Sequence, residues 1–565
     1  MKSVVLAILA LGVCLLLSTH STRGSEPPPY TKVDPEAMSH WRARKFGLFI
    51  HWGPNCQKGG EIGWSRQGPR RGRSKEGTGT IPMEIYDNLY KTFNPTLFDA
   101  QEWAQIAKDA GMKYMVFTSK HHDGFSMFDS AVTEYDIMST PFQRDVVKEL
   151  SEACKEKNLQ FGVYYSPRDW YHADFATERH DAYLSFYMAQ LKELVTNYKP
   201  LMVLWFDGLD SPRELWKDVP ERSFELLRNA QPDIILNNRG GLPGDYDTPE
   251  QHIGGFNRTR PWETCMTIAN QWSWKPNDQT KSIKQCIQTL LRVVGGDGNL
   301  LFNLGPRPDG TFEPEQVARL REMGQWLQQY GNTVYGTRGG PFKPGTWGAS
   351  TCQDNKIFLF IMNWPGDMDF PLPVLPMEIE ACRALTSGDV TMKETAEGVS
   401  LSMKPEDRDP VATVVELTVA GDAFQIDPVD IHLFGQPLAV RDATASNVFQ
   451  NREEYCAKKA IDRQDSTRWA TDSGTHEAWI ELDLGKETTV GAAQVREAFA
   501  GRVQSFLWEV PDAEGWKTIH KGNALAEGDI IPLKPVTTRK IRFHITQATE
   551  GPTLWEIILY PPKEN

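Results

Sequence analysis

A single carboxylate, Asp207, ends an otherwise apolar stretch of the sequence. The stretch Leu201 to Gly208 (LMVLWFDG) is typical of a strand buried on both faces, and Asp207 follows at its carboxyl end. A charge is costly there unless it is paired or used in chemistry. In a barrel of alternating strands and helices, catalytic groups collect at that end. Asp207 is therefore a candidate catalytic group, although capping of the next helix would explain it equally well.

Several other predicted strands also end in hydrogen-bonding or aromatic side chains. These residues are His51, His121, His122, Tyr164, Trp205 and Arg239. Barrel stability needs only apolar layers, so their repeated occurrence indicates a site for a neutral, polyhydroxylated ligand. Adjacent residues of an extended strand point to opposite faces, so we do not expect His121 and His122 to chelate one metal ion. We expect catalysis without a cofactor.

If the ligand is a sugar, its hydrolysis needs a second carboxyl group besides Asp207. The candidates are Glu250 and Glu263, which lie on an irregular stretch after the predicted strand Ile234 to Arg239. Loops on that face can reach over the site. Both residues could instead be exposed or paired with nearby arginines, so the residue pattern alone leaves the choice open.

Strands and helices alternate around these residues. Helical spacing in Pro95 to Ala110, for example, precedes a predicted strand at Lys113 to Ser119. Repeats of this kind predict a (β/α)8-like barrel over residues 25–338, irregular between Gly240 and Gln279. Short alternating runs then predict a β-sandwich over 339–437 and a jelly-roll β-sandwich over 438–565.

The first 24 residues carry one lysine and an apolar run of about 15 residues, which is typical of a secretory signal peptide. The run is short for a membrane span, so we expect a secreted or periplasmic protein with no transmembrane segment. The net charge of −13 argues against nucleic acid as a partner. The seven later cysteines lack CxxC spacing and are predicted to be free or core thiols.

Seven motifs together resemble the retaining alpha-L-fucosidase family. They are FGLFIHWG (46–53), KYMVFTSKHHDGF (113–125), GVYYSP (162–167), LWFDG (204–208), TPEQ (248–251), PWETCMT (261–267) and GNLLFNLGPRPDG (298–310). The resemblance implies a (β/α)8-like domain followed by a β-sandwich. It also implies release of terminal alpha-linked L-fucose, with retention, through a covalent fucosyl-enzyme.

The resemblance also implies roles for single residues. Asp207 matches the nucleophile, and Glu250 matches the acid/base, with Glu263 as its rival. The residues that match the fucose-binding positions are His51, Trp64, His121, His122, Tyr164, Trp205, Arg239 and Trp272. Where many members have Glu-Trp, this chain has Glu61-Ile62-Gly63-Trp64, so Glu61 could substitute only if the loop differs. The basic insert 68–77 is either a solvated loop or a contact for an anionic, sulfated glycan.

The C-terminal unit resembles discoidin-type, coagulation-factor C-domain-like modules, which are frequent glycan-binding appendages. The resemblance rests on AKKAIDRQDSTRWAT (457–471) and AWIELDLG (478–485). It implies a structural Ca2+ held by Asp462, Asp465, Thr467 and Glu556, whose oxygen ligands suit that ion. The alternative is that these polar residues only shape a tight turn beside Trp469.

Three functions remain in competition at this point. The first is an exo-acting alpha-L-fucosidase whose partner is a fucosylated glycan, neutral or sulfated. The second is a retaining glycosidase for another sugar of similar stereochemistry. The third is a non-catalytic glycan-binding or adhesion protein, against which the presence of both Asp207 and Glu250 counts.

Overall fold

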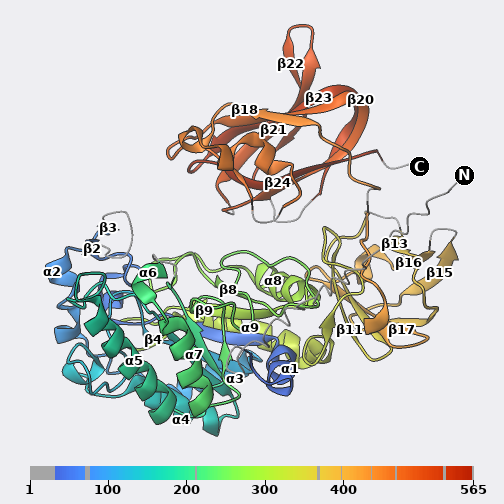
Figure 1. Cartoon of the computed structure of the whole chain (residues 1–565). Helices are drawn as coiled ribbons and strands as arrows, with labels where there is room; N and C mark the ends of the chain where they lie inside the picture. Colours follow the sequence, from blue (N-terminus) through green and yellow to red (C-terminus); the bar gives the residue numbers. More distant parts are fainter. Residues whose placement is uncertain are drawn as a thin grey trace, which may run out of the picture.

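The computed structural model shows a barrel, a β-sandwich beside it and a third, all-β unit (Figure 1). It describes residues 32–69, 77–209, 213–365, 369–395, 398–433, 435–464, 467–499, 501–525 and 530–562. The predicted signal peptide, residues 70–76 of the basic insert and Asp465 lie outside the described residues.

The barrel is built on a parallel sheet whose strand order is β7-β6-β5-β4-β1-β9-β8. Its strands are β1 (Phe46–Ile50), β4 (Tyr114–Lys120), β5 (Gln160–Tyr165), β6 (Val203–Phe206), β7 (Ile235–Leu236), β8 (Glu263–Thr267) and β9 (Asn299–Leu304). A short pair, β2 (Gln67–Gly68) and β3 (Gly77–Thr78), lies outside this sheet.

An irregular segment takes the eighth position, between β7 and β8. Single parallel bridges join Asn237 to Tyr246, Asp247 to Trp262, and Glu250 to Cys265. The predicted (β/α)8-like fold is thus confirmed, with its irregularity in this segment. One local prediction is wrong, because Glu263 begins strand β8 and does not lie on an irregular stretch.

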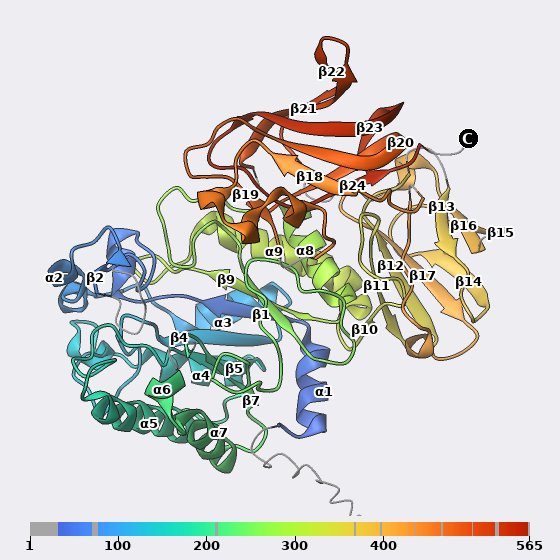
Figure 2. The same cartoon turned by 45° about the horizontal axis from the view of Figure 1, so that its top comes forward.

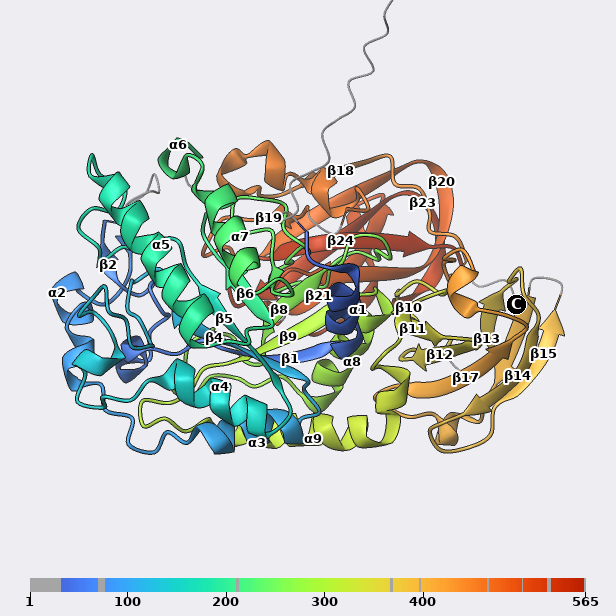
Figure 3. The same ribbon diagram turned by 60° about the horizontal axis from the view of Figure 1, so that its bottom comes forward.

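Helices cover the outside of the parallel sheet, as Figure 3 shows for α3, α4, α5 and α7. The α-helices are α1 (Pro35–Arg44), α2 (Met83–Tyr86), α3 (Ala100–Asp109), α4 (Val146–Glu156), α5 (His180–Asn197), α6 (Arg213–Trp216), α7 (Val219–Ala230), α8 (Ile283–Gly295) and α9 (Pro314–Tyr330). Side-chain caps fix some of the starts: Asp99 accepts backbone N–H groups at α3, and Ser282 forms a capping box at α8.

Alternation along the strands decides which side chains enter the barrel. Both faces are buried, so β1, β6 and β9 are apolar throughout or nearly so. The inner layer includes Phe49, Trp205 and Leu301, which pack together in one cluster. His51, Asp207 and Asn303 each follow one of these three residues by two positions in the sequence. The two-residue period therefore places these three polar groups on the inner face, at the carboxyl ends of the strands.

The second unit has two antiparallel sheets. One is β10 (Arg338–Gly339), β11 (Gly348–Gln353), β12 (Lys356–Ile361), β17 (Thr413–Val419) and β14 (Ile379–Ala384), in that order. The other is β13 (Phe370–Pro373), β16 (Gly398–Ser402) and β15 (Thr391–Thr395). Apolar residues such as Leu359, Phe370 and Leu417 fill the core of this unit.

The third unit is also antiparallel and has a separate core around Trp469, Trp508 and Phe543. Its strands are β18 (Asp442–Ala445), β19 (Trp469–Ala470), β20 (Ala478–Glu497), β21 (Val503–Asp512), β22 (Gly515–Gly522), β23 (Ile530–Ala548) and β24 (Thr553–Tyr560). Strand β24 lies on the side of this unit that faces the barrel (Figures 1 and 2).

Two predictions about the whole chain can be compared with the structure. The seven cysteines after residue 24 are free, as their spacing predicted. Within the described part of the chain, no helix combines the length and apolarity that a membrane crossing requires.

Candidate active site

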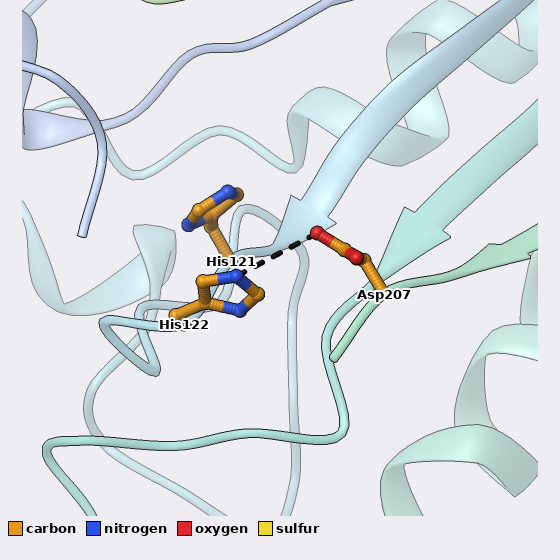
Figure 4. Close-up of side chains that lie close together, drawn as sticks. All are labelled: His121, His122 and Asp207. Atoms are coloured by element: carbon orange, nitrogen blue, oxygen red, sulfur yellow. Dashed lines mark ion pairs between the residues drawn. The ribbon is translucent and has the colours of Figure 1, made fainter. Parts of the chain in front are cut away.

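Asp207 lies at the carboxyl end of β6 and is held from three sides. Tyr164 Oη donates to its Oδ2 at 2.9 Å, and Arg239 Nη1 donates to its Oδ1 at 3.1 Å. His122 Nε2 lies 3.6 Å from Oδ2, the contact drawn in Figure 4. Burial alone would raise the pKa of Asp207, but the Arg239 guanidinium and the other donors lower it below its usual value. The group is therefore an ionised, oriented carboxylate.

Arg239 joins Asp207 to Glu250. Its Nε and Nη2 donate to Thr248 Oγ1 and O at 2.8 and 2.9 Å, and its guanidinium lies 4.8 Å from the centre of the Trp205 ring. Its Nη1 also donates to Glu250 Oε2 at 2.9 Å. Because one nitrogen contacts both carboxylates, their bonded oxygens are at most about 6 Å apart. Retaining glycosidases hold their two carboxyl groups about 5–5.5 Å apart.

Glu263, the rival of Glu250, occupies a different level of the barrel. Glu263 is the first residue of β8, so it lies at the amino end of that strand. In a parallel barrel the catalytic groups lie at the other end, where the strands finish. Its side chain is fully buried and accepts hydrogen bonds from Trp205 Nε1, at 3.3 Å, and from Tyr114 Oη. Burial raises the pKa of Glu263 to about 7. This carboxyl group therefore holds the Trp205 ring from inside the barrel, on the side away from the catalytic end of the strands.

The three histidines of the site are buried, and burial favours the neutral form of His51 and His121. His51 Nδ1 is 2.7 Å from Asn303 Oδ1, and burial lowers the pKa of His51 to about 4. Burial also lowers the pKa of His121, whose ring stacks on Tyr164 at 5.3 Å. His122 Nδ1 is 2.6 Å from Ser166 Oγ. A neutral imidazole has one donor and one acceptor, which suits recognition of hydroxyl groups.

One geometric argument about these histidines is wrong. Strand β4 ends at Lys120, so the alternation of an extended strand no longer applies to His121 and His122. Their ring centres lie 4.2 Å apart (Figure 4), and one ligand atom from each, with one from Asp207, lie within 4.8 Å of one another. Arg239 already balances the charge of Asp207. Catalysis without a metal stays a prediction.

The remaining predicted pocket residues come from two loops. The Trp272 ring lies 4.9 Å from that of His51, and the Trp64 ring lies 5.5 Å from that of His122. Glu61 accepts from the backbone N–H groups of Trp272 and Ser273 at 3.1 and 3.4 Å, and burial raises its pKa to about 8. The altered Glu61 loop therefore fixes the backbone that carries Trp272. The structure brings all of the predicted barrel-site residues together except Glu263, which lies beneath them.

Three further contacts of the site were missed by the sequence reasoning. They are made by Asn303 with His51, Ser166 with His122, and Thr248 with Arg239. Asn303 could have been found, because it follows Leu301 by two residues on the inner face of β9. Ser166 and Thr248 act through loop geometry, for which the sequence contains no periodic signal.

The predicted calcium ligands lie in the third unit. Thr467 Oγ1 donates to Asp462 Oδ1 at 2.7 Å. The Arg463 N–H donates to Glu556 Oε2 at 3.0 Å, whereas Glu556 Oε1 is buried and has no hydrogen-bond partner among the described residues. A buried carboxylate oxygen in this position lacks the partner that such atoms need, and a cation would supply it.

Comparison with known proteins agrees with this geometry. A model of the family described as Alpha-L-fucosidase matches residues 14–332, and a model of the F5/8 type C domain matches residues 442–558. Over 399 residues the chain is 30% identical to plasma alpha-L-fucosidase of Rattus norvegicus, covering 64% of this chain and 86% of that protein.

Two solved structures are similar over about two thirds of this chain. Alpha-L-fucosidase isoenzyme 1 from Paenibacillus thiaminolyticus has 31% identity and a TM-score of 0.61, covering 68% of this chain and 99% of that one. An alpha-L-fucosidase from Bacteroides thetaiotaomicron, trapped as a covalent intermediate with 2-fluoro-fucosyl fluoride, has 27% identity and a TM-score of 0.61. That match covers 69% of this chain and 97% of the other.

Proposed function

This chain belongs to the alpha-L-fucosidase family of glycoside hydrolases, and we propose that it releases terminal alpha-linked L-fucose from glycans with retention. The observation that carries the proposal is the shared contact of Asp207 and Glu250 with Arg239 Nη1, which keeps two carboxyl groups near the spacing of a retaining pair. The trapped covalent intermediate of the Bacteroides relative supports a covalent route.

The first step forms a fucosyl-enzyme. The Asp207 carboxylate attacks C1 of the fucosyl group, the bond from C1 to the glycosidic oxygen breaks, and that oxygen takes the proton of Glu250. In the second step Glu250 takes a proton from water, the water oxygen attacks C1, and the ester bond to Asp207 breaks. Tyr164 and Arg239 orient Asp207 for attack.

The surrounding side chains suit a sugar better than a charged ligand. His51 and His121 offer neutral ring nitrogens, His122 adds a third buried imidazole, and Trp205 and Trp272 offer flat apolar faces. We assign these residues, with Trp64, to binding of the fucosyl group. A binding role for the sugar hydroxyls explains why three buried histidines gather around one carboxylate.

The anomer that forms first tests the proposal. Hydrolysis of an alpha-L-fucoside is expected to give alpha-L-fucose before mutarotation, because two inversions at C1 restore the starting configuration. Proton NMR in the first minutes of a reaction with excess enzyme distinguishes the two anomers. Initial formation of beta-L-fucose would contradict the double displacement, and absence of fucose release would contradict the activity.

Two finer predictions concern location and substrate charge. We propose export from the cytoplasm on the basis of the apolar run within residues 1–24. Recognition of a sulfated glycan by the basic insert stays a prediction, because residues 70–76 lie outside the described part of the chain.

For the third unit we propose a structural Ca2+ held by Asp462 and Glu556, with Thr467 and Asp465 completing the set. The buried, unpartnered Glu556 Oε1 beside the Asp462 turn supports this proposal. Bound there, the ion would neutralise two carboxylates and tie the turn after Ala460 to strand β24. It would take no part in the reaction, since the catalytic carboxyl groups are in the barrel.

Removal of Ca2+ is expected to lower the unfolding temperature of the third unit. An ion at about a hundred times its Kd contributes about 2.7 kcal/mol, which corresponds to a fall of about 10 °C in the Tm of a unit of this size on chelation. Calorimetry with EDTA, followed by re-addition of Ca2+ or Mg2+, measures the change. Glu556→Gln should abolish the Ca2+ response, and an equal response in that variant would contradict the assignment.

A further inference from the structure

We propose that His252 and five residues of the third unit bind the glycan from which fucose is removed. The five residues, here called the Arg468 cluster, are Tyr455, Arg468, Phe499, Arg502 and Trp555. The proposal rests on the proposed function, because it assigns the leaving-group side of that reaction.

The link between the two units is a contact of rings beside the proposed acid/base. His252 Nδ1 lies 2.9 Å from the backbone oxygen of Glu250. The His252 ring centre lies 6.0 Å from that of Trp555 on β24. The leaving group must extend from the glycosidic oxygen that Glu250 protonates. The proposal places the leaving-group sugar on the side of Glu250 where His252 and then Trp555 lie.

The Arg468 cluster is held together by cation–π contacts. The Arg468 guanidinium lies 5.3, 5.6 and 5.7 Å from the ring centres of Trp555, Tyr455 and Phe499. Arg502 lies 4.0 Å from the Phe499 ring and is fixed by a hydrogen bond to the Gly551 oxygen at 2.8 Å. Each contact of this kind stabilises the arrangement modestly, and together they fix the orientation of three rings.

The chemistry of the Arg468 cluster fits an oligosaccharide. The Phe499 side chain is 44% exposed, and Tyr455 and Trp555 are half-buried, so aromatic surface remains open. Flat rings stack on the C–H faces of sugars, and guanidinium groups donate to hydroxyl, carboxylate or sulfate oxygens. Among the described residues no carboxylate forms an ion pair with Arg468, and its buried Nε has no hydrogen-bond partner, so the guanidinium is not committed to an acidic side chain.

The test compares two substrates and two tryptophans. Alpha-L-fucosyl fluoride has a leaving group of one atom, which cannot reach Trp555. A panel of 2-, 3-, 4- and 6-linked fucosylated oligosaccharides, neutral and sulfated, supplies long leaving groups. The matched control for Trp555→Ala is Trp516→Ala. Trp516 is also half-buried and stacks on an arginine, at 3.8 Å, but it is on β22.

We expect Trp555→Ala to lower kcat/KM about tenfold for the oligosaccharide that the unchanged protein cleaves fastest. For the fluoride, kcat/KM should stay within about twofold of the unchanged protein. Arg468→Gln should reproduce this pattern, with a larger effect on sulfated members of the panel if the guanidinium binds the anionic group. Trp516→Ala should leave both substrates unaffected.

The outcomes separate this proposal from the proposed function. If the unchanged protein fails to hydrolyse the fluoride, the proposed function is wrong. If it hydrolyses the fluoride but no oligosaccharide, or if Trp555→Ala and Trp516→Ala behave alike, only the Arg468 cluster is wrongly assigned. An equal loss on both substrates in Trp555→Ala would also overturn the assignment, because it would indicate a general effect on the fold.

Discussion

Asp207→Asn is expected to lower kcat by at least about ten-thousandfold. The change keeps the shape of the side chain but removes the carboxylate that forms the bond to C1. The fold should tolerate it, since Arg239 keeps its contacts with Glu250 and Thr248. Steady-state kinetics with an aryl alpha-L-fucoside measures the loss. Turnover within about tenfold of the unchanged protein, a barrier change of only about 1.4 kcal/mol, would remove Asp207 from the role of nucleophile.

Rescue by azide gives this prediction a second readout. In Asp207→Ala the vacated space can admit azide, which attacks C1 from the side of the lost carboxylate. The single inversion should give beta-L-fucosyl azide and restore part of the turnover. Thermal unfolding of both variants serves as the control for folding, and formation of the alpha azide would place the nucleophile elsewhere.

Glu250→Ala is expected to lower kcat/KM about a thousandfold for fucosides with poor leaving groups, and far less for fucosyl fluoride. Only a poor leaving group needs a proton as the bond to C1 breaks. Azide should also rescue this variant at the second step, but here it attacks the fucosyl-enzyme and should give the alpha azide. The two variants are therefore distinguished by the anomer of the azide that they form.

Glu263→Gln is the matched control for Glu250→Ala. Glu263 supports Trp205 from within the barrel, so its replacement should change kcat/KM by a similar factor for every leaving group. A strong dependence on the leaving group in Glu263→Gln, without one in Glu250→Ala, would reverse the assignment of the acid/base.

Local patterns were sufficient to predict the residues at the ends of regular strands. Asp207 and His51 follow apolar runs whose alternation determines the inner face, and neighbouring parallel strands bring such ends together. The same reasoning predicted the barrel, the β-sandwich and the third unit, because strand and helix periods are properties of short segments.

The errors came from interactions between distant segments. The stretch ETCMT (263–267) is too polar to predict a buried strand, and its glutamate is tolerated because Tyr114 and Trp205, on other strands, donate to it. The strand predicted at Lys113 to Ser119 ends at Lys120, and the turn that follows brings the rings of His121 and His122 together. Neither the donors nor the turn leaves a periodic trace in the sequence.

The contact between His252 and Trp555 also bears on how proteins of this kind diversify. It joins the barrel to a unit whose core is separate and whose sequence follows after the β-sandwich. Fusion, loss or exchange of such a module by gene recombination would change the surroundings of the leaving group while the pocket around Asp207 stays intact. Selection for a new glycan can then act on the appended module alone, and the residues that break the bond need not change.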